Sequence, residues 1–448
     1  MSARKSIAVI GSGISGLSAA WLLSRAHDVT LYEQDGRLGG HSNTVDVPIG
    51  GDGQGRLPVD TGFIVFNEAC YPNLIALFDR LDVPTSPTDM GFSVSIDAGR
   101  YEYSGNGIGG LFGQSSNLLR PGHWRMVADL LRFFREAPKA DGALSGYDVS
   151  LGDYLATQRY SDEFIARHIL PMAAAIWSTP SADVLEFPLS AFLRFFSNHG
   201  LLQVRNRPLW RTVRGGSREY VRRLTADMNA EIRAGEPVRA VTRSFEGVEI
   251  VTRQGSRSFD GVVLATHADD ALRLLADADG EERQLLGSFR YARNRAVLHR
   301  DATFMPRRRR LWSSWNYLGI GEGLNRRLSV TYWMNKLQPL GEAPELFVTL
   351  NPACDFAAEH EIAAFDYAHP MFDARAMSAQ RGLWRLQGRR RTWFCGSYFG
   401  YGFHEDGIQS GLAAAEAVGG VRRPWQVVDE SGRIHLHPSP APLAEAAE

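Results

Sequence analysis

The sequence has 448 residues, 44% of them hydrophobic, and a formal net charge of −1 at pH 7. This length allows two domains or one large two-part unit with a sizeable core, and the balanced charge argues against a nucleic-acid partner. Three scattered cysteines fit neither a disulfide framework nor a metal site, so we expect no metal. The sequence shows no signal peptide and no apolar run of about 18 residues. We therefore expect a cytoplasmic protein, and attachment to the inner face of a membrane stays open.

The first predicted element is a strand over residues 7–10, followed by a glycine-rich turn and a helix. The turn has the spacing G-x-G-x-x-G, formed by Gly11, Gly13 and Gly16. In such a turn the first glycine permits the tight bend, the second lets a pyrophosphate approach the backbone, and the third lets the helix pack close to the strand. The helix begins near Ile14 and Ser15, where free backbone N–H groups favour phosphate.

The second predicted strand, over residues 29–33, ends at an acid. Glu33 lies 22 residues after Gly11, where a carboxylate accepts hydrogen bonds from an adenosine ribose. Gln34 follows directly and is expected beside the same ribose. The order of strand, glycine turn, helix, strand and acid therefore predicts a dinucleotide-binding site.

The segment after this acid indicates which dinucleotide binds. Arg37 is suited to a forked bond with phosphate oxygens, and Gly39 and Gly40 let the backbone pass close beneath a cofactor. With these residues the chain resembles the FAD-binding superfamily of amine oxidases and phytoene desaturases, whose N-terminal signature is G-x-G-x-x-G, a ribose acid and R-x-G-G. His41 stands where amine oxidases usually carry Arg. The resemblance implies noncovalent FAD and an α/β fold, with a Rossmann-like FAD-binding domain interleaved with an α+β substrate domain.

The same resemblance implies further cofactor contacts. An Asp-x-Gly segment at Gly62 and Phe63 is expected near the flavin, and the backbone of Val238 is expected on the adenine side. Towards the C-terminus, a predicted strand ending at Gly396 leads to a helix that the family aims at the flavin ring. The start of this helix adds three expected contacts: Glu405, Asp406 and Ile408. Its N–H groups would favour the anionic reduced flavin.

Cofactor signatures at both ends of the chain predict interleaved domains. The FAD-binding domain is expected to combine residues 1–82, 211–268 and 390–420. The substrate domain is expected to combine residues 83–210 and 269–389, and residues 421–448 are expected to form a peripheral tail. Within the first segment, an apolar run predicts a strand over residues 57–66 that Gly62 interrupts.

Three residues are candidates for acid–base or positioning roles beside the flavin: His41, His404 and Lys336. Packing around the cofactor explains the two histidines equally well, and Lys336 is a candidate because amine oxidases place a lysine near flavin N5. His267, at the end of a predicted strand, is interpreted as structural. Four consecutive arginines, 307–310, form either a solvated loop or a contact with anionic lipid headgroups.

Residues 173–202 are rich in bulky apolar side chains, which either fill a core or form the wall of an apolar substrate site. The sequence is also similar to a bacterial branch of the superfamily marked by R-L-G-G-H and G-F-H-E-D-G. This branch is associated with cyclopropane or methyl-branched fatty acid synthesis. The resemblance implies a flavin desaturase that removes hydride from the acyl chain of a small-molecule lipid. A flavin amine oxidase and a redox-neutral isomerase of fatty acid double bonds stay open.

Overall fold

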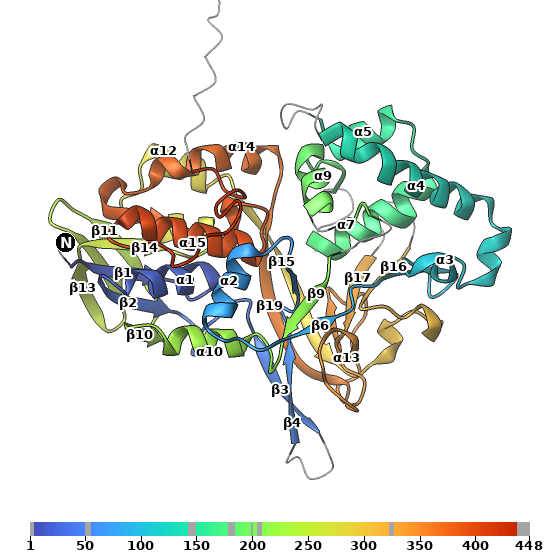
Figure 1. Cartoon of the computed structure of the whole chain (residues 1–448), viewed down its shortest axis with the longest axis horizontal. Helices are drawn as coiled ribbons and strands as arrows, with labels where there is room; N and C mark the ends of the chain where they lie inside the picture. Colours follow the sequence, from blue (N-terminus) through green and yellow to red (C-terminus); the bar gives the residue numbers. More distant parts are fainter. Residues whose placement is uncertain are drawn as a thin grey trace, which may run out of the picture.

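A computed structural model describes residues 4–49, 55–141, 149–177, 184–198, 200–203, 208–321 and 327–436. The chain forms two lobes that lie side by side (Figure 1). One lobe contains a parallel sheet between helices, and the other contains a mostly antiparallel sheet with a helical layer. This mixed architecture confirms the α/β fold class that the sequence predicts.

The first lobe is built on a five-stranded parallel sheet in the order β10-β2-β1-β14-β20. Its strands are β1 (Ser6–Ile10), β2 (Asp28–Glu33), β10 (Ala230–Ala234), β14 (Gly261–Leu264) and β20 (Thr392–Phe394). The central strands are apolar along their length because helices cover both faces. One face shares a core with α1 (Ile14–Leu23), α2 (Pro72–Arg80), α10 (Arg218–Ala226) and α15 (His404–Val418). Since all five strands run the same way, the turns that follow them meet at one edge.

The second lobe is built on a seven-stranded sheet in the order β19-β15-β18-β17-β16-β7-β8. Its strands are β7 (Phe92–Ile96), β8 (Tyr101–Ser104), β15 (Arg290–His299), β16 (Trp315–Ile320), β17 (Arg327–Trp333), β18 (Phe347–Leu350) and β19 (Glu361–Met371). The helical layer consists of α4 (Pro121–Asp141), α5 (Leu151–Thr157), α7 (Leu170–Trp177) and α9 (Leu189–Asn198). None of the helices in the described ranges is long and apolar enough to cross a membrane.

The phenylalanine-rich stretch before and along α9 belongs to the core of this second lobe. Phe187, Phe192 and Phe196 are buried and pack in the same cluster as Val94 of β7 and Tyr317 of β16. The side chains of residues 176, 177 and 195 lie outside the described part of the structure. Of the two sequence interpretations of this stretch, core packing therefore accounts for the described side chains.

The expected strand over residues 57–66 is divided. β4 (Gly55–Asp60) pairs with β3 (Thr44–Ile49) in a hairpin, and β5 (Phe66–Asn67) joins a separate small sheet with β6 (Thr85–Thr88) and β9 (Trp210–Val213). Between β4 and β5 the chain leaves regular structure at Gly62. A Cβ on Gly62 would lie 2.2 Å from the carbonyl oxygen of His41, so this glycine permits contact between two backbone segments.

Three helices lie on a different sheet from the one that the sequence assigns to them. α11 (Ala268–Leu274), α12 (Gly280–Leu286) and α14 (Ala374–Leu383) share a core with β1 and β14 on the second face of the parallel sheet. A smaller antiparallel sheet of β11 (Ala240–Arg243), β12 (Val248–Thr252) and β13 (Gly255–Phe259) joins them there. Residues 269–286 and 374–383 therefore belong to the first lobe, although they fall in the segment 269–389 that was expected to form the substrate domain. An apolar helix face predicts burial but does not say against which sheet.

The chain after α15 is not a peripheral tail over residues 421–436. Trp425 stacks on Trp21 of α1 with ring centroids 5.7 Å apart. The buried guanidinium of Arg423 binds Glu416 and Asn73. Arg433, whose side chain is only 11% exposed, places its Nε 2.7 Å from Oδ1 of the buried Asp406. Ion pairs and one aromatic stack therefore hold this segment against the first lobe. The sequence did not indicate that the charged side chains of this segment make such contacts.

Candidate active site

A cavity of about 760 Å³ lies at the carboxyl edge of the parallel sheet. Its walls come from the turn after β1, the end of β2, the segment 37–41, the segment 61–65, the end of β14 and the turn before α15. Tyr367 and His369 of β19 and Phe92 of β7 bring the second sheet into the same wall. Ligands of open parallel sheets bind at this edge, so the cavity joins a nucleotide-type site to the second lobe.

The glycines of the first turn have the roles that their spacing predicts. Gly11 has a φ of +101°, and a Cβ there would lie 2.7 Å from the carbonyl oxygen of Ala265. A Cβ on Gly16 would lie 1.9 Å from the carbonyl oxygen of Gly11, so only glycine lets α1 pack against the turn. Gly13 differs, because a Cβ there would meet no protein atom within 4 Å. The free space beside Gly13 is part of the cavity, which this glycine lines.

The end of the cavity beside α1, where a pyrophosphate is predicted to bind, contains hydrogen-bond donors that have no acceptor. Gly13 precedes α1 and offers no side chain to cap it, which leaves the N–H groups of Ile14 and Ser15 directed to the cavity edge. Within the described residues, Nη1 of Arg37 is buried and has no hydrogen-bond partner. Gly40 approaches closely, since its Cβ would lie 3.2 Å from Cα of Gly13. These donors fit the pyrophosphate of a dinucleotide.

The ribose end is formed around Glu33. One oxygen of this carboxylate accepts from the backbone N–H of Ser12 at 2.9 Å and from its hydroxyl at 2.6 Å. The other oxygen accepts from the N–H of Asp35 at 2.9 Å. The carboxylate is thus held at the end of β2, and Gln34 and Val238 line the cavity beside it. Glu33, Gln34 and Val238 lie together, as expected for contacts to an adenosine.

Four histidines line the opposite part of the cavity: His41, His267, His369 and His404. The ring of His41 stacks on Tyr367 at 5.0 Å and lies 5.3 Å from His369. Nε2 of His41 is buried and finds no hydrogen-bond partner in the described residues. Burial, together with the neighbouring histidines, lowers the pKa of His41 well below its ordinary value, so the imidazole is neutral at pH 7.

His404 occupies the start of α15, where the family places the flavin ring. Its ring stacks on Phe63 with centroids 3.6 Å apart. Nε2 of His404 lies 3.0 Å from the hydroxyl of Ser42 and 3.2 Å from that of Tyr220. Burial lowers the pKa of His404 to about 3. The side chain is therefore a neutral, hydrogen-bonded part of the cavity wall.

His369 was missed by the sequence analysis, and its surroundings fix its tautomer. Oδ1 of Asn294 accepts from Asn351 at 2.6 Å, which leaves the Asn294 amide as a donor to Nδ1 of His369 at 2.8 Å. Burial lowers the pKa of His369 to about 4, so the neutral ring carries its proton on Nε2 and can donate into the cavity. The sequence does contain one signal that could have identified His369: it lies two residues after Tyr367, which places both side chains on the same face of a strand.

Several expected site residues lie elsewhere. Glu405 accepts hydrogen bonds from Asn73, from the N–H of Leu74 and from Gln409 inside the first lobe. Asp406 accepts from the N–H of Phe403 and pairs with Arg433. These two acids and Ile408, which packs in the core, do not line the cavity. At the start of a helix, successive side chains point in different directions, so only His404 faces the cavity.

Lys336 is also absent from the cavity wall. It lies on the short α13 (Met334–Leu337), and its Nζ is 3.6 Å from Asp89. Gly396 does line the cavity, and its N–H donates to the hydroxyl of Ser410 on α15. The structure therefore brings His41 and His404 to the cavity and leaves Lys336 in a partly exposed ion pair.

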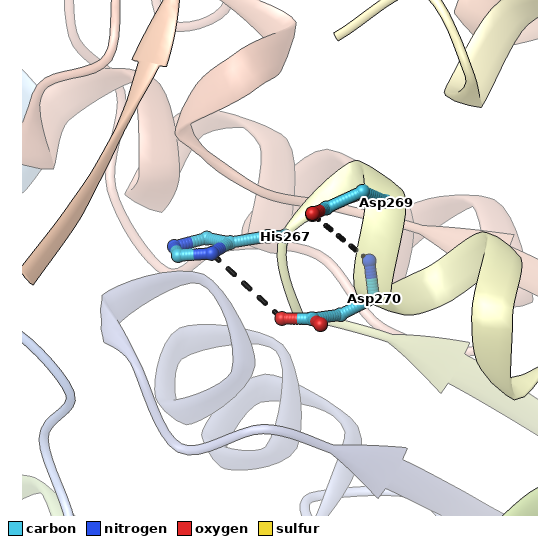
Figure 2. A group of neighbouring side chains, drawn as sticks. All are labelled: His267, Asp269 and Asp270. Atoms are coloured by element: carbon cyan, nitrogen blue, oxygen red, sulfur yellow. Dashed lines mark hydrogen bonds and ion pairs between the residues drawn. The ribbon is translucent and has the colours of Figure 1, made fainter. Parts of the chain in front are cut away.

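His267, Asp269 and Asp270 lie close together at the start of α11 (Figure 2). Nδ1 of His267 is 3.8 Å from Oδ2 of Asp270, and Oδ1 of Asp269 accepts from the N–H of Asp270. Arg273 pairs with Asp270, and the two acids stand in the first turn of the helix, where the dipole favours negative charge. The position of the acids in the first helical turn and this ion pair account for the group.

The buried histidines predict a pH dependence of stability. Below about pH 6.5 the unfolded chain protonates His369 and His404 while the folded apoprotein does not. The free energy of unfolding should therefore fall, from pH 6.5 toward pH 4, by about 1.4 kcal/mol per pH unit for each histidine. Urea unfolding of the apoprotein across this range measures the slope. His404→Phe leaves Ser42 and Tyr220 paired and should make the slope shallower; an unchanged slope would contradict this assignment.

A glycine turn, a ribose acid and unpartnered phosphate donors define a dinucleotide-binding site, and its cavity, shared with a second sheet, fits the FAD and substrate of a flavin oxidoreductase. The profile of the flavin containing amine oxidoreductase family matches residues 14–296. The chain belongs to this family, and FAD is its cofactor.

Individual relatives are more distant. AofH of Mycobacterium tuberculosis strain H37Rv, named as a flavin-containing monoamine oxidase, is 27% identical over 269 residues. This match covers 58% of the present chain and 56% of AofH, about half the length of that relative. A fatty acid isomerase from P. acnes and cyclohexylamine oxidase from Brevibacterium oxydans share the fold, with TM-scores of 0.64 and 0.66. Each is 16% identical over 93% of this chain and 99% of its own.

Proposed function

We propose that this flavin enzyme removes a hydride from the acyl chain of a lipid and so introduces a double bond. The observation that carries the proposal is the apolar end of the cavity. Beyond the histidines its wall consists of bulky apolar side chains: Met90, Phe92, Met172, Leu201, Trp315, Tyr332 and Phe372. Burying a CH₂ group gains about 0.8 kcal/mol, so such a wall binds an acyl chain without a charged anchor.

The placement of acids in the cavity also supports this substrate. Glu33, Glu236 and Asp35 belong to the ribose end, where the N–H of Glu236 donates to the carbonyl of Glu33. Asp270 is paired with Arg273, and Asp366 lies on β19 opposite Arg295. Three of the five acids that line the cavity thus lie at the ribose end, and each of the other two lies next to an arginine. This distribution of acids favours an uncharged substrate over an ammonium group.

The proposed reaction breaks two C–H bonds on neighbouring carbons. FAD, when bound, accepts the hydride from one carbon. The other carbon loses a proton, and the electrons left behind form the C=C bond. Nε2 of His41 is buried and has no hydrogen-bond partner in the described structure, so its position makes it the proposed acceptor of this proton. His369, held as an Nε2–H donor, orients groups in the same part of the cavity.

The test is anaerobic mixing of the holoenzyme with phospholipids that carry monounsaturated or methyl-branched chains. We expect bleaching of the flavin and a lipid product that is lighter by two hydrogens. His41→Gln should retain FAD but slow bleaching by about 10²–10⁴-fold, whereas His267→Gln is the control from the same cavity. Bleaching by simple amines and not by lipids would replace this proposal with an amine oxidase. A lipid of unchanged mass with a moved double bond would replace it with an isomerase.

A further inference from the structure

Exposed apolar side chains gather at the outer end of the second lobe. Ile108 and Leu119 are 79% and 87% exposed, and Leu118, Trp124 and Leu131 are each about half exposed. They lie on α3 (Gly107–Leu111), on the 3₁₀ turn Ser115–Leu119 and on α4. Figure 1 shows α3 and the start of α4 at the side of this lobe that faces away from the parallel sheet. We call these five side chains the outer apolar face.

The outer apolar face is not an uncovered part of the core of the second lobe. α4 already buries one side, through Met126, Leu130 and Phe133. On its solvent side, four residues at helical spacing form a row that contains no acid: Trp124, Ala128, Leu131 and Arg135. A surface helix of a soluble lobe normally carries polar residues there. Exposed apolar side chains grouped on neighbouring elements in this way indicate a binding surface.

The charges around the outer apolar face are basic. Residues 98–131, which include the whole face, contain three arginines, at 100, 120 and 125, and two acids, Glu102 and Asp129. The side chain of Asp129 is only 16% exposed and pairs with Arg132. Glu102 is fully buried and already paired with Arg308. The exposed charge beside the apolar side chains is therefore positive, although Arg125 shares an ion pair with Glu163 at the edge. Apolar side chains that project beside basic ones match the surface of an anionic bilayer.

We propose that the outer apolar face docks on anionic lipid bilayers. A tryptophan among the projecting side chains is typical of such contacts, since its ring prefers the headgroup level. A second copy of the chain fits less well. A two-fold interface uses the same patch of both copies and would therefore bring the basic side chains of both copies into one interface.

The outer apolar face adjoins the cavity wall. α3 begins directly after β8, and β8 pairs with β7. The side chain of Asn106, just before α3, packs on Gly91, where a Cβ would lie 3.0 Å from its Oδ1. Gly91 and Phe92 both line the cavity. A bilayer on this face would therefore lie beside the apolar end of the cavity.

This surface replaces the arginine run as the place of contact. Within the run of residues 307–310, Arg308 pairs with the buried Glu102, and Arg309 pairs with Glu345 while lying over Trp312. Two of these four charges are thus neutralised within the protein. Fewer charges of this run are therefore available to bind lipid headgroups than the sequence suggests. The apolar side chains needed for insertion into a bilayer lie on the outer apolar face instead.

The experiment is cosedimentation of the FAD-loaded protein with two kinds of vesicle, one of phosphatidylcholine and one of equimolar phosphatidylcholine and phosphatidylglycerol. We expect binding to the anionic vesicles that salt weakens. The double variant Ile108→Ser/Leu119→Ser should lower the partition coefficient at least about tenfold. The matched control is Phe245→Ser/Val428→Ser, which removes two apolar side chains that are 101% and 84% exposed on the first lobe. Its partition coefficient should stay unchanged.

Three outcomes would overturn the docking proposal. These are the absence of binding to either vesicle, equal binding by the Ile108→Ser/Leu119→Ser variant, and self-association of the protein that this variant alone abolishes. Flavin absorbance and the melting temperature of both double variants show that the fold is kept. Because vesicle binding requires no turnover, its result is independent of whether the lipid acyl chain is the substrate.

Discussion

Gly13→Val is expected to give a folded protein that holds no flavin. A Cβ at this position meets no protein atom within 4 Å, and the residue has a φ of −64°, which valine adopts without strain. The added methyl groups would instead fill the space beside the uncapped start of α1. The pyrophosphate of FAD needs this space to reach the backbone N–H groups.

Flavin absorbance after purification and urea unfolding of the apoproteins measure the two halves of this prediction. The contrasting variant is Gly16→Ala, whose methyl group would lie 1.9 Å from the carbonyl oxygen of Gly11. It should destabilise the apoprotein as well, because the backbone itself must move. A yellow Gly13→Val protein would show that the cofactor does not lie against this turn.

Arg433→Met is expected to lower the free energy of unfolding by about 3–5 kcal/mol, because it leaves a buried carboxylate without its partner. Arg433 pairs with Asp406, which is 0% exposed, and its Nη1 donates to the carbonyl of Cys70 at 2.9 Å. Burial raises the pKa of Asp406, and Arg433 is the positive charge that opposes this rise. Urea unfolding measures the loss.

The control is Arg422→Met in the same segment. This side chain is 54% exposed and pairs with Glu416 and Glu430, and exposed ion pairs contribute about 0–1 kcal/mol. In the Arg433→Met background, Asp406→Asn should recover part of the stability by removing the unpaired charge. Equal losses for the two arginine variants would mean that the segment after α15 contributes little to the fold.

The two ends of the site differ in how far the sequence predicts them. The contacts at the ribose and phosphate end are set by neighbours in sequence: a glycine turn, the strand before it and the acid that ends the next strand. Local spacing is therefore sufficient to find Gly11, Gly13, Gly16 and Glu33. The catalytic end is assembled from β19, from the segment around His41 and from the start of α15. His369 had no local motif, whereas Lys336 had a family precedent but points to Asp89.

The sequence by itself determined the parallel strands and the glycine turn, because apolar periodicity and backbone freedom act over a few residues, and its resemblance to the family implied the FAD class. Only the tertiary structure decided which side chains reach the cavity, since Glu405, Asp406 and His404 are neighbours yet have different surroundings. It also decided that α11, α12 and α14 pack on the parallel sheet and that Arg433 is buried. These outcomes depend on contacts between segments far apart in the chain, and a pattern of residue types does not encode which apolar face meets which sheet.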